Sequence, residues 1–158
     1  MIEQFFIQNG GIILRLVVAI VLGMLIGAER LFVHKEAGMK THALVSMGSA
    51  LFIIISEYLA IKYSISGNYD PARIASNIIV GIGFLGAGSI IFQNSQLRGL
   101  TTASGLWVTA GIGMAAGFGF FSLAVIVTIL ILVIFLSMNF IEKPIKKISD
   151  RIDKIEIN

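Results

Sequence analysis

Four polar residues near the ends of apolar stretches have the side-chain chemistry of a cation site: Glu57, Asp70, Arg73 and Asn77. Mg²⁺ prefers oxygen ligands in proteins, usually one or two carboxylates together with water. Glu57 and Asp70 are therefore candidate Mg²⁺ ligands. Asp70 also precedes Arg73 by three residues, and Arg73 shares a helix face with Asn77, so the same group could be a purely structural polar cluster.

Glu57 leaves two interpretations open because it lies within an apolar stretch. A carboxylate in the hydrocarbon core of a bilayer needs either a cation to pair with or a proton. Arg15, which lies within another apolar stretch, and Arg73 are the cations that could form such a pair. Arg15 could instead extend its guanidinium to the membrane surface. Glu57 is therefore either half of a structural ion pair or part of a site for a cation or a proton.

The elements that carry these residues are predicted to be membrane-spanning helices. The chain is 56% hydrophobic and 13% charged, with a mean hydropathy of +0.92, which is far from the composition of a soluble domain. About 20 apolar residues cross the hydrocarbon core as a helix. We therefore predict an all-α fold, a polytopic membrane bundle of five transmembrane helices over residues 1–140. The predicted spans are 11–28, 43–61, 72–92, 100–117 and 118–140.

Local signals at the helix ends refine these spans. Asp70 followed by Pro71, Thr41 and Thr101 are each predicted to cap the N-terminus of the span that follows. Only Gly117-Phe118-Gly119 separates the fourth span from the fifth, so we expect a tight antiparallel hairpin there.

Small residues inside the spans predict close helix packing, because glycines let helix backbones approach each other in a membrane. Thr101, Gly105, Thr109, Gly113 and Gly117 recur every four residues along one face of the fourth span. Gly83 and Gly86 are expected to face this span through Gly105 and Gly113. The predicted packing glycines are Gly23, Gly27, Gly81, Gly83, Gly86, Gly88, Gly105 and Gly113.

The distribution of basic residues predicts the orientation in the membrane. Of the 12 Lys and Arg residues, nine fall in the loops 29–42 and 93–99 or in the tail after residue 140. Two fall on the opposite side, and Arg15 lies within a span. Because cytoplasmic loops carry an excess of Lys and Arg, we predict a plasma-membrane protein with its N-terminus outside and its C-terminus in the cytoplasm.

Charged and hydroxyl side chains gather at the predicted cytoplasmic ends of the spans. The electropositive start of the fourth span, with Arg98 and Lys40 nearby, would suit an anionic group. The bias of basic residues toward the cytoplasm would also account for these cations, so both interpretations stand. The residues of this predicted cytoplasmic rim are Glu29, Arg30, Lys40, His42, Arg98, Thr101 and Thr102.

Residues 141–158 are predicted to form a short cytoplasmic amphipathic helix. Isoleucines recur in steps of four and three between charged residues, and Pro144 would lie in the first turn. Such a helix could lie on the inner leaflet or self-associate as a short coiled coil.

The chain lacks the residues that several classes of protein function require. The chain has no cysteine and two histidines, which excludes a thiolate metal site and a zinc site built from three or four His or Cys ligands. It has no phosphate-binding loop and no arrangement of a nucleophile with a base. We therefore expect a protein that is not an enzyme, has no cofactor other than a potential Mg²⁺ ion, and binds no nucleic acid.

Five sequence strings are specific in combination. They are Gly27-Ala-Glu-Arg30, Ala37-Gly-Met-Lys-Thr-His-Ala43, Asp70-Pro-Ala-Arg-Ile-Ala75, Gly81-Ile-Gly-Phe-Leu-Gly-Ala-Gly88 and Arg98-Gly-Leu-Thr-Thr-Ala-Ser-Gly-Leu-Trp107. Over about residues 10–138 the chain resembles the MgtC/SapB family. The resemblance implies a bacterial plasma-membrane protein with a five-helix core, linked to growth in low magnesium and, in some pathogens, to survival inside host cells.

The chain departs from the family pattern in two places. Leu31 follows Glu29 and Arg30, where many relatives carry a second acidic residue. Any acidic cluster at this place therefore has one carboxylate fewer in this chain. Longer members carry a soluble cytoplasmic domain after the last span, where this sequence has the isoleucine-repeat tail, so we expect a short form.

Two functions remain in competition. The first is a non-enzymatic regulator that binds another membrane protein through its small-residue faces; the resemblance suggests the F-type ATP synthase, which one family member is linked to inhibiting. The second is a transporter or channel for Mg²⁺ or another cation. Five helices enclose only a narrow pore, so the second function would favour a homo-oligomer in the lipid bilayer.

Overall fold

The structure is a computed structural model that describes residues 2–63, 70–93 and 96–156, and helices make up most of the described part. The predicted all-α fold is confirmed. The helices are α1 (Ile2–Phe32), α2 (Met39–Tyr63), α3 (Pro71–Gly88), α4 (Leu100–Gly117) and α5 (Phe121–Glu156). Two short antiparallel strands, β1 (Ile91–Gln93) and β2 (Gln96–Arg98), form a hairpin between α3 and α4.

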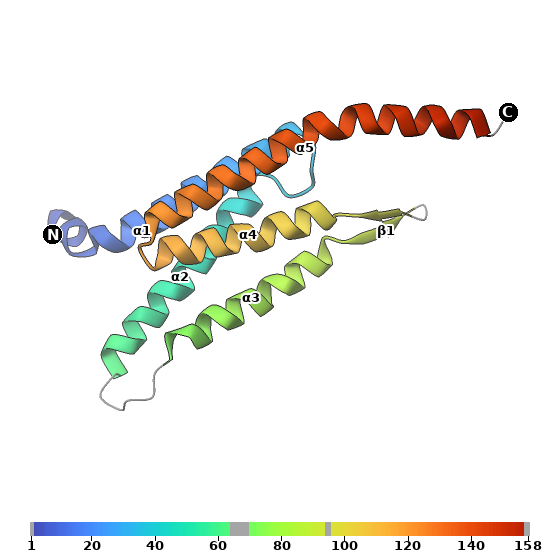
Figure 1. Ribbon diagram of the computed structural model, residues 1–158. Helices are drawn as coiled ribbons and strands as arrows, with labels where there is room; N and C mark the ends of the chain where they lie inside the picture. The colour runs from blue at the N-terminus through green and yellow to red at the C-terminus, as the bar shows by residue number, and fades with distance from the viewer. Residues whose placement is uncertain (1, 64–69, 94–95, 157–158) are drawn as a thin grey trace.

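Successive helices run back and forth, so the start of α1 and the end of α5 lie at opposite ends of the molecule (Figure 1). The α1–α2 connection and the β-hairpin lie toward one end, and the α4–α5 turn lies toward the other. α4 is the central helix, which contacts each of the other four. α3 lies at the periphery, beside α2 and α4.

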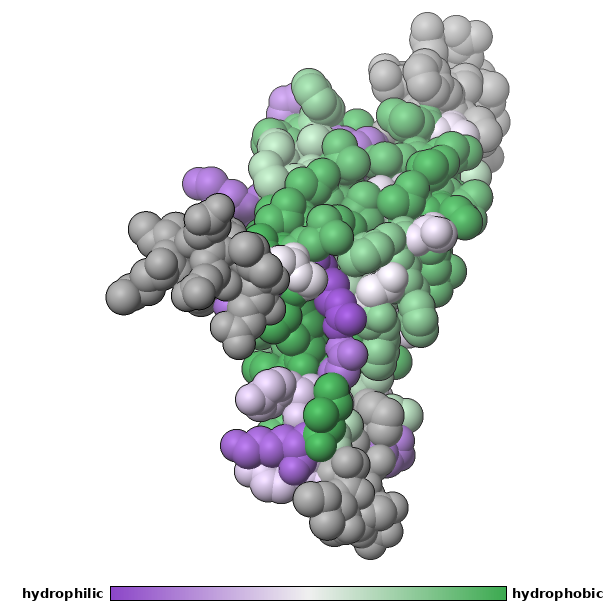
Figure 2. Space-filling view, turned by 90° about the vertical axis from the view of Figure 1, so that its left-hand side faces the viewer, coloured by the Kyte–Doolittle hydropathy of each residue, from purple (hydrophilic) through white to green (hydrophobic). Residues whose placement is uncertain are grey.

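Three described helical stretches are long and apolar enough to cross a membrane: Asn9–Phe32, Met39–Tyr63 and Phe121–Met138. Ala72–Gly88 is a shorter apolar helix. α4 is rich in Gly, Ala and Thr because it is buried among the other helices, and ten of its residues are buried. Hydrophobic side chains cover most of the face shown in Figure 2, as expected of a protein that lies in a membrane. Because only three of the described helices meet the length and hydropathy of a membrane span, the five predicted crossings stay a prediction.

Glycines bring α2 into backbone contact with both α1 and α4. A Cβ built at Gly113 would lie 2.1 Å from the Ser46 carbonyl oxygen, and one at Gly117 would lie 2.8 Å from the Ala50 carbonyl oxygen. On the α1 side, a Cβ at Gly23 or Gly27 would come within 2.6 Å or 2.5 Å of the α2 backbone. Only glycine fits at such positions, so these residues fix how closely the three helices pack.

The predicted packing of α3 onto α4 forms only in part. A Cβ at Gly86 would meet Ala103 of α4 at 3.6 Å, but nothing lies within 4 Å of a Cβ at Gly81, Gly83 or Gly88. Gly105 faces Phe135 and His42, and Gly113 faces α2. Within the described part of the chain, most glycines of the glycine-rich string of α3 therefore contact no other helix.

The helix ends agree with one of the three predicted caps. The Asp70 Oδ1 atom accepts a hydrogen bond from the Ala72 amide at 2.9 Å, with Pro71 in the first turn of α3. The predictions for Thr41 and Thr101 are wrong, because α2 already begins at Met39 and Gly99 is the N-cap of α4. Gly99 has a φ of 89°, and a Cβ there would lie 1.9 Å from the Ser89 carbonyl oxygen.

Two observed helix ends also differ from the predicted ones. The third helix ends at Gly88 rather than at residue 92, because the chain turns into the β-hairpin. α5 continues without interruption to Glu156, so Pro144 lies within this helix and not in the first turn of a separate one. The predicted tight turn between α4 and α5 is present, with Gly119 at a φ of 79°.

Candidate functional site

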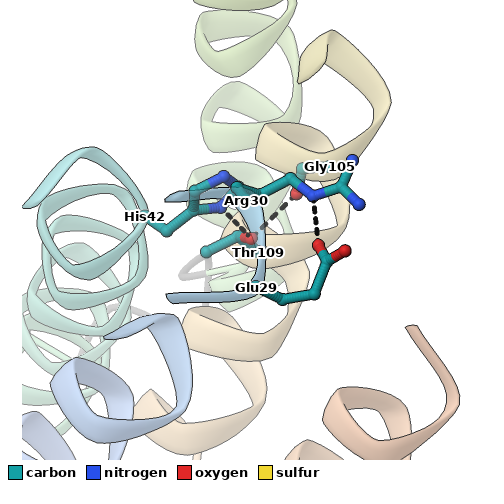
Figure 3. A network of polar contacts seen from close by, with 5 residues as sticks. All are labelled: Glu29, Arg30, His42, Gly105 and Thr109. Atoms are coloured by element: carbon teal, nitrogen blue, oxygen red, sulfur yellow. Dashed lines mark hydrogen bonds and ion pairs between the residues drawn. The ribbon is translucent and has the colours of Figure 1, made fainter. Parts of the chain in front are cut away.

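Two groups of polar side chains lie between the helices. The first, the histidine site, consists of Glu29 and Arg30 of α1, His42 of α2, Gly105 and Thr109 of α4, and Phe135 of α5. Figure 3 shows all of these except Phe135, which contacts Arg30. The second, the Arg15 site, joins Arg15 of α1 to Glu57 of α2 near the α4–α5 turn.

Arg30 is a buried cation with two compensating contacts. Its side chain is 2% exposed, and its Nε atom donates a hydrogen bond to the Glu29 carboxylate. The guanidinium carbon lies 3.4 Å from the centre of the Phe135 ring, a cation–π contact. A buried charge is costly unless it is paired. The arrangement therefore neutralises Arg30 and connects α1 to α5.

His42 is fully buried, and its hydrogen bonds define its tautomer. Its Nδ1 atom lies 2.8 Å from the Thr109 hydroxyl oxygen, and that hydroxyl donates to the Gly105 carbonyl oxygen at 2.8 Å. A hydroxyl has one proton to donate. The His42 Nδ1–H group must therefore be the donor to Thr109.

Two buried side-chain atoms in the described part of the chain have no hydrogen-bond partner: His42 Nε2 and Ser46 Oγ. They belong to residues one helical turn apart on the same face of α2. The geometry of the histidine site is consistent with a neutral imidazole whose Nε2 lone pair is unused. This part of the core keeps hydrogen-bonding capacity that its neighbours do not satisfy.

The predicted cytoplasmic rim divides into a buried and an exposed part. Glu29, Arg30, His42 and Thr102 are buried in the bundle. The remaining members of the rim are exposed: Lys40, Arg98 and Thr101. The structure therefore does not gather the rim into one basic site at the start of α4.

At the Arg15 site, the guanidinium pairs with the Glu57 carboxylate. The Arg15 Nη1 atom also donates to the Gly117 carbonyl oxygen at 3.0 Å, and both side chains are partly exposed. A Cβ at Gly119 would lie 3.6 Å from Arg15 Nε, so the turn packs on the guanidinium. Of the partners considered for Glu57, the structure selects Arg15 and not Arg73.

The other members of the predicted polar cluster remain separate from Glu57. Asp70, Arg73 and Asn77 are exposed at the start of α3. Among the described residues no ion pair joins Asp70 to Arg73, and Asp70 acts as the α3 cap. Within the same part of the chain, no group of three or more His, Asp or Glu side chains could hold a metal ion.

Two residues of the histidine site, Thr109 and Phe135, were not singled out as site residues from the sequence, nor was Ser46 beside it. The row of Gly and Thr residues in α4 was the signal for Thr109, since Gly105, Thr109, Gly113 and Gly117 are all buried. Nothing in the sequence indicates that Phe135 faces Arg30, because the two are far apart in the chain.

Comparison with known proteins identifies relatives over most of the chain. The profile of the MgtC family matches residues 16–144. A protein of Escherichia coli (strain K12) with the name "Putative magnesium transporter YhiD" is 44% identical over 133 residues, which cover 81% of this chain and 62% of that protein. "Protein MgtC" of Salmonella typhimurium (strain LT2) is 47% identical over 120 residues, which cover 76% of this chain and 49% of the relative.

A third bacterium also has such a relative. "Protein MgtC" of Brucella abortus (strain 2308) is 42% identical over 116 residues, which cover 73% of this chain and 46% of that protein. The chain therefore spans less than two thirds of the length of these relatives. No solved structure matches it. The profile match and the identities above 40% show that this membrane protein belongs to the MgtC family.

Proposed function

We propose that this protein supports adaptation to low magnesium as a non-enzymatic regulator that binds another membrane protein. The name of one relative, "Putative magnesium transporter YhiD", connects the family to magnesium. The observation that carries the choice of a regulator is the state of two carboxylates in the apolar helices. Glu29 is paired with Arg30, and Glu57 is paired with Arg15.

These ion pairs argue against a magnesium pathway through the chain. Mg²⁺ is bound by carboxylates and water, and a carboxylate in lipid is the group that an ion pathway would use. At both sites an arginine already neutralises the carboxylate, and its positive charge opposes the approach of a divalent cation. The buried polar groups instead connect α1, α2, α4 and α5 to one another, as in a rigid scaffold.

A cation transporter is the second candidate, and one observation favours it. The chain is 44% identical to a protein whose name describes a magnesium transporter. In that case the Arg15–Glu57 pair would have to open during transport so that Glu57 could reach the ion.

Purified protein in liposomes with an enclosed magnesium-sensitive dye separates the two functions. We expect no Mg²⁺ uptake above that of protein-free liposomes. Uptake that is lost in Glu57→Gln but retained in Glu36→Gln would support transport and overturn the regulator. Glu36 is a matched control because its side chain is exposed in the α1–α2 connection.

The regulator also needs a positive test. The family resemblance suggests the F-type ATP synthase as the partner, and ATP-driven acidification of inverted membrane vesicles reports on that enzyme. We expect slower acidification in vesicles from cells that produce this protein than in vesicles from cells that lack it, at equal amounts of ATP synthase. Equal rates would remove this partner from the proposal.

A further inference from the structure

A cavity of about 380 Å³ lies where the first turns of α2 and α4 meet the end of α3. Its polar side chains include Thr41 of α2, Thr102 of α4 and Glu36 of the α1–α2 connection. Most of its wall is apolar, with Leu85 and Leu106 among the lining residues. The cavity lies toward the end of the molecule that holds the α1–α2 connection and the β-hairpin (Figure 1).

Two helices begin at this cavity. Thr41 and Thr102 are each the third residue of their helix. The first backbone amides that donate to a carbonyl oxygen of the preceding turn belong to the next residues, His42 and Ala103. The amides of the first three residues of α2 and of α4 therefore have no partner within their own helix. At α4 no side chain caps the helix start. The positive ends of two helix dipoles thus lie beside one cavity.

Thr102 is a buried donor without a partner at the same place. It is 4% exposed, and its hydroxyl makes no hydrogen bond to another described residue. Ser104, two residues later, donates to the Leu100 carbonyl oxygen within α4. Buried hydroxyl groups nearly always have a partner. Because Thr102 lines the cavity, its free hydroxyl indicates a ligand that presents an acceptor oxygen there.

The cavity lies where apolar helical stretches end. The apolar stretch Met39–Tyr63 begins beside it, and the apolar stretch Ala72–Gly88 ends beside it, since Gly88 is one of the lining residues. Phospholipid headgroups replace acyl chains at the depth where apolar spans end. A cavity with polar groups at two helix starts and otherwise apolar walls matches a molecule that joins a charged headgroup to an apolar chain.

We propose that this cavity binds the phosphate group of a phosphatidylethanolamine molecule, whose oxygens accept hydrogen bonds from the Thr102 hydroxyl and from the free amides of α2 and α4. A helix N-terminus is equivalent to about half a positive charge, so two together balance the single negative charge of a phosphodiester. The glycerol and the first methylene groups of the lipid would pack on the apolar wall. The inference does not depend on the proposed function.

Charge selects this headgroup over other phosphates. No Lys or Arg is among the described residues that line the cavity, whereas sites for free phosphate, with its higher charge, use such cations. The exposed Glu36 carboxylate does line it. Its negative charge disfavours an anionic headgroup and favours one that also carries an ammonium group.

Native mass spectrometry of the purified full chain in detergent tests the choice of lipid. The protein is incubated with equal concentrations of phosphatidylethanolamine and phosphatidylglycerol, and the bound lipids are identified by mass. We expect a severalfold excess of bound phosphatidylethanolamine. Equal binding of the two lipids, or a preference for phosphatidylglycerol, would overturn the proposal. Displacement of the lipid by inorganic phosphate would identify free phosphate as the ligand and would overturn it as well.

Substitution of Thr102 tests the site itself. Thr102→Val keeps the shape of the side chain and removes the donor, so it should weaken phosphatidylethanolamine binding about tenfold, as expected for a hydrogen bond to a charged group. Thr102→Ser should retain the affinity. Thr101→Val is the matched control, because Thr101 is exposed and does not line the cavity. Unchanged affinity in Thr102→Val would contradict the inference.

The melting temperature of the lipid-free protein separates lost binding from lost folding. Because the Thr102 hydroxyl has no hydrogen-bond partner in the described part of the chain, Thr102→Val should leave this temperature unchanged. A clear decrease would show that the hydroxyl stabilises the fold through a partner of its own chain, and would overturn the assignment of Thr102 to a lipid.

Discussion

The hydroxyl of Thr109 accepts a hydrogen bond from His42 of α2 and donates one to the Gly105 carbonyl oxygen within α4, so a single oxygen connects α2 to α4 at the histidine site. Thr109→Val keeps the shape of the side chain but leaves the His42 Nδ1–H group buried without a partner. We expect a loss of about 1–3 kcal/mol in the free energy of unfolding. Thr109→Ser should retain most of the stability.

Thermal unfolding in detergent measures this effect, with Thr101→Val as the control. Thr101 belongs to the same face pattern but is exposed at the start of α4. An unfolding temperature of Thr109→Val equal to that of Thr101→Val would show that the hydrogen bond contributes nothing to stability.

For single residues, the sequence reduced the number of candidate contacts but did not identify the actual partner in each case. The location of Glu57 in an apolar stretch predicted a cationic partner, but the choice between Arg15 and Arg73 depends on how α1 packs against α2. The cap at Asp70 was predictable, since an Asp before a Pro acts within one helical turn. The contact between Arg30 and Phe135 was not predictable, because it depends on the tertiary arrangement of α1 and α5.

Among the elements, α4 shows how glycine position governs packing. Gly111 and Gly113 differ by two residues, and their surroundings are opposite. A Cβ at Gly113 would lie 2.1 Å from the Ser46 carbonyl oxygen, whereas nothing lies within 4 Å of a Cβ at Gly111. Gly113→Ala should therefore force α2 and α4 apart and cost about 1–3 kcal/mol or more.

Gly111→Ala is the matched control for that substitution, because it adds the same methyl group to the same helix. It should fold as well as the natural chain, or slightly better, since Ala is the stronger helix former. The amount of folded protein extracted from membranes and its unfolding temperature measure both outcomes. Equal stability of the two variants would contradict the packing of α4 against α2.

The hydropathy pattern located all five helices but did not predict the packing of α3. Glycines within a membrane helix indicate a close contact but do not identify the partner, and no described atom lies within 4 Å of a Cβ at Gly81, Gly83 or Gly88. The β-hairpin was missed because strands of three residues, such as Ile91–Gln93, are too short to interrupt an apolar window.

For the whole molecule, the alternating helices predict that the two ends of α2 lie on opposite sides of the membrane. The distribution of basic residues predicts that the α1–α2 connection lies in the cytoplasm. A membrane-impermeant maleimide should therefore label Tyr63→Cys on intact spheroplasts, and label Glu36→Cys only after lysis. Both residues are exposed in the structure. The reverse pattern would invert the predicted orientation.

The pairing of Arg15 with Glu57 and of Arg30 with Glu29 has a consequence for the energised cell. Moving one elementary charge across the membrane changes its energy by about 2.3 kcal/mol per 100 mV. Each ion pair carries no net charge, so the electric field exerts almost no net force on the helices that hold them. We therefore expect these two ion pairs not to drive a movement of α1 against α2 when the membrane is depolarised.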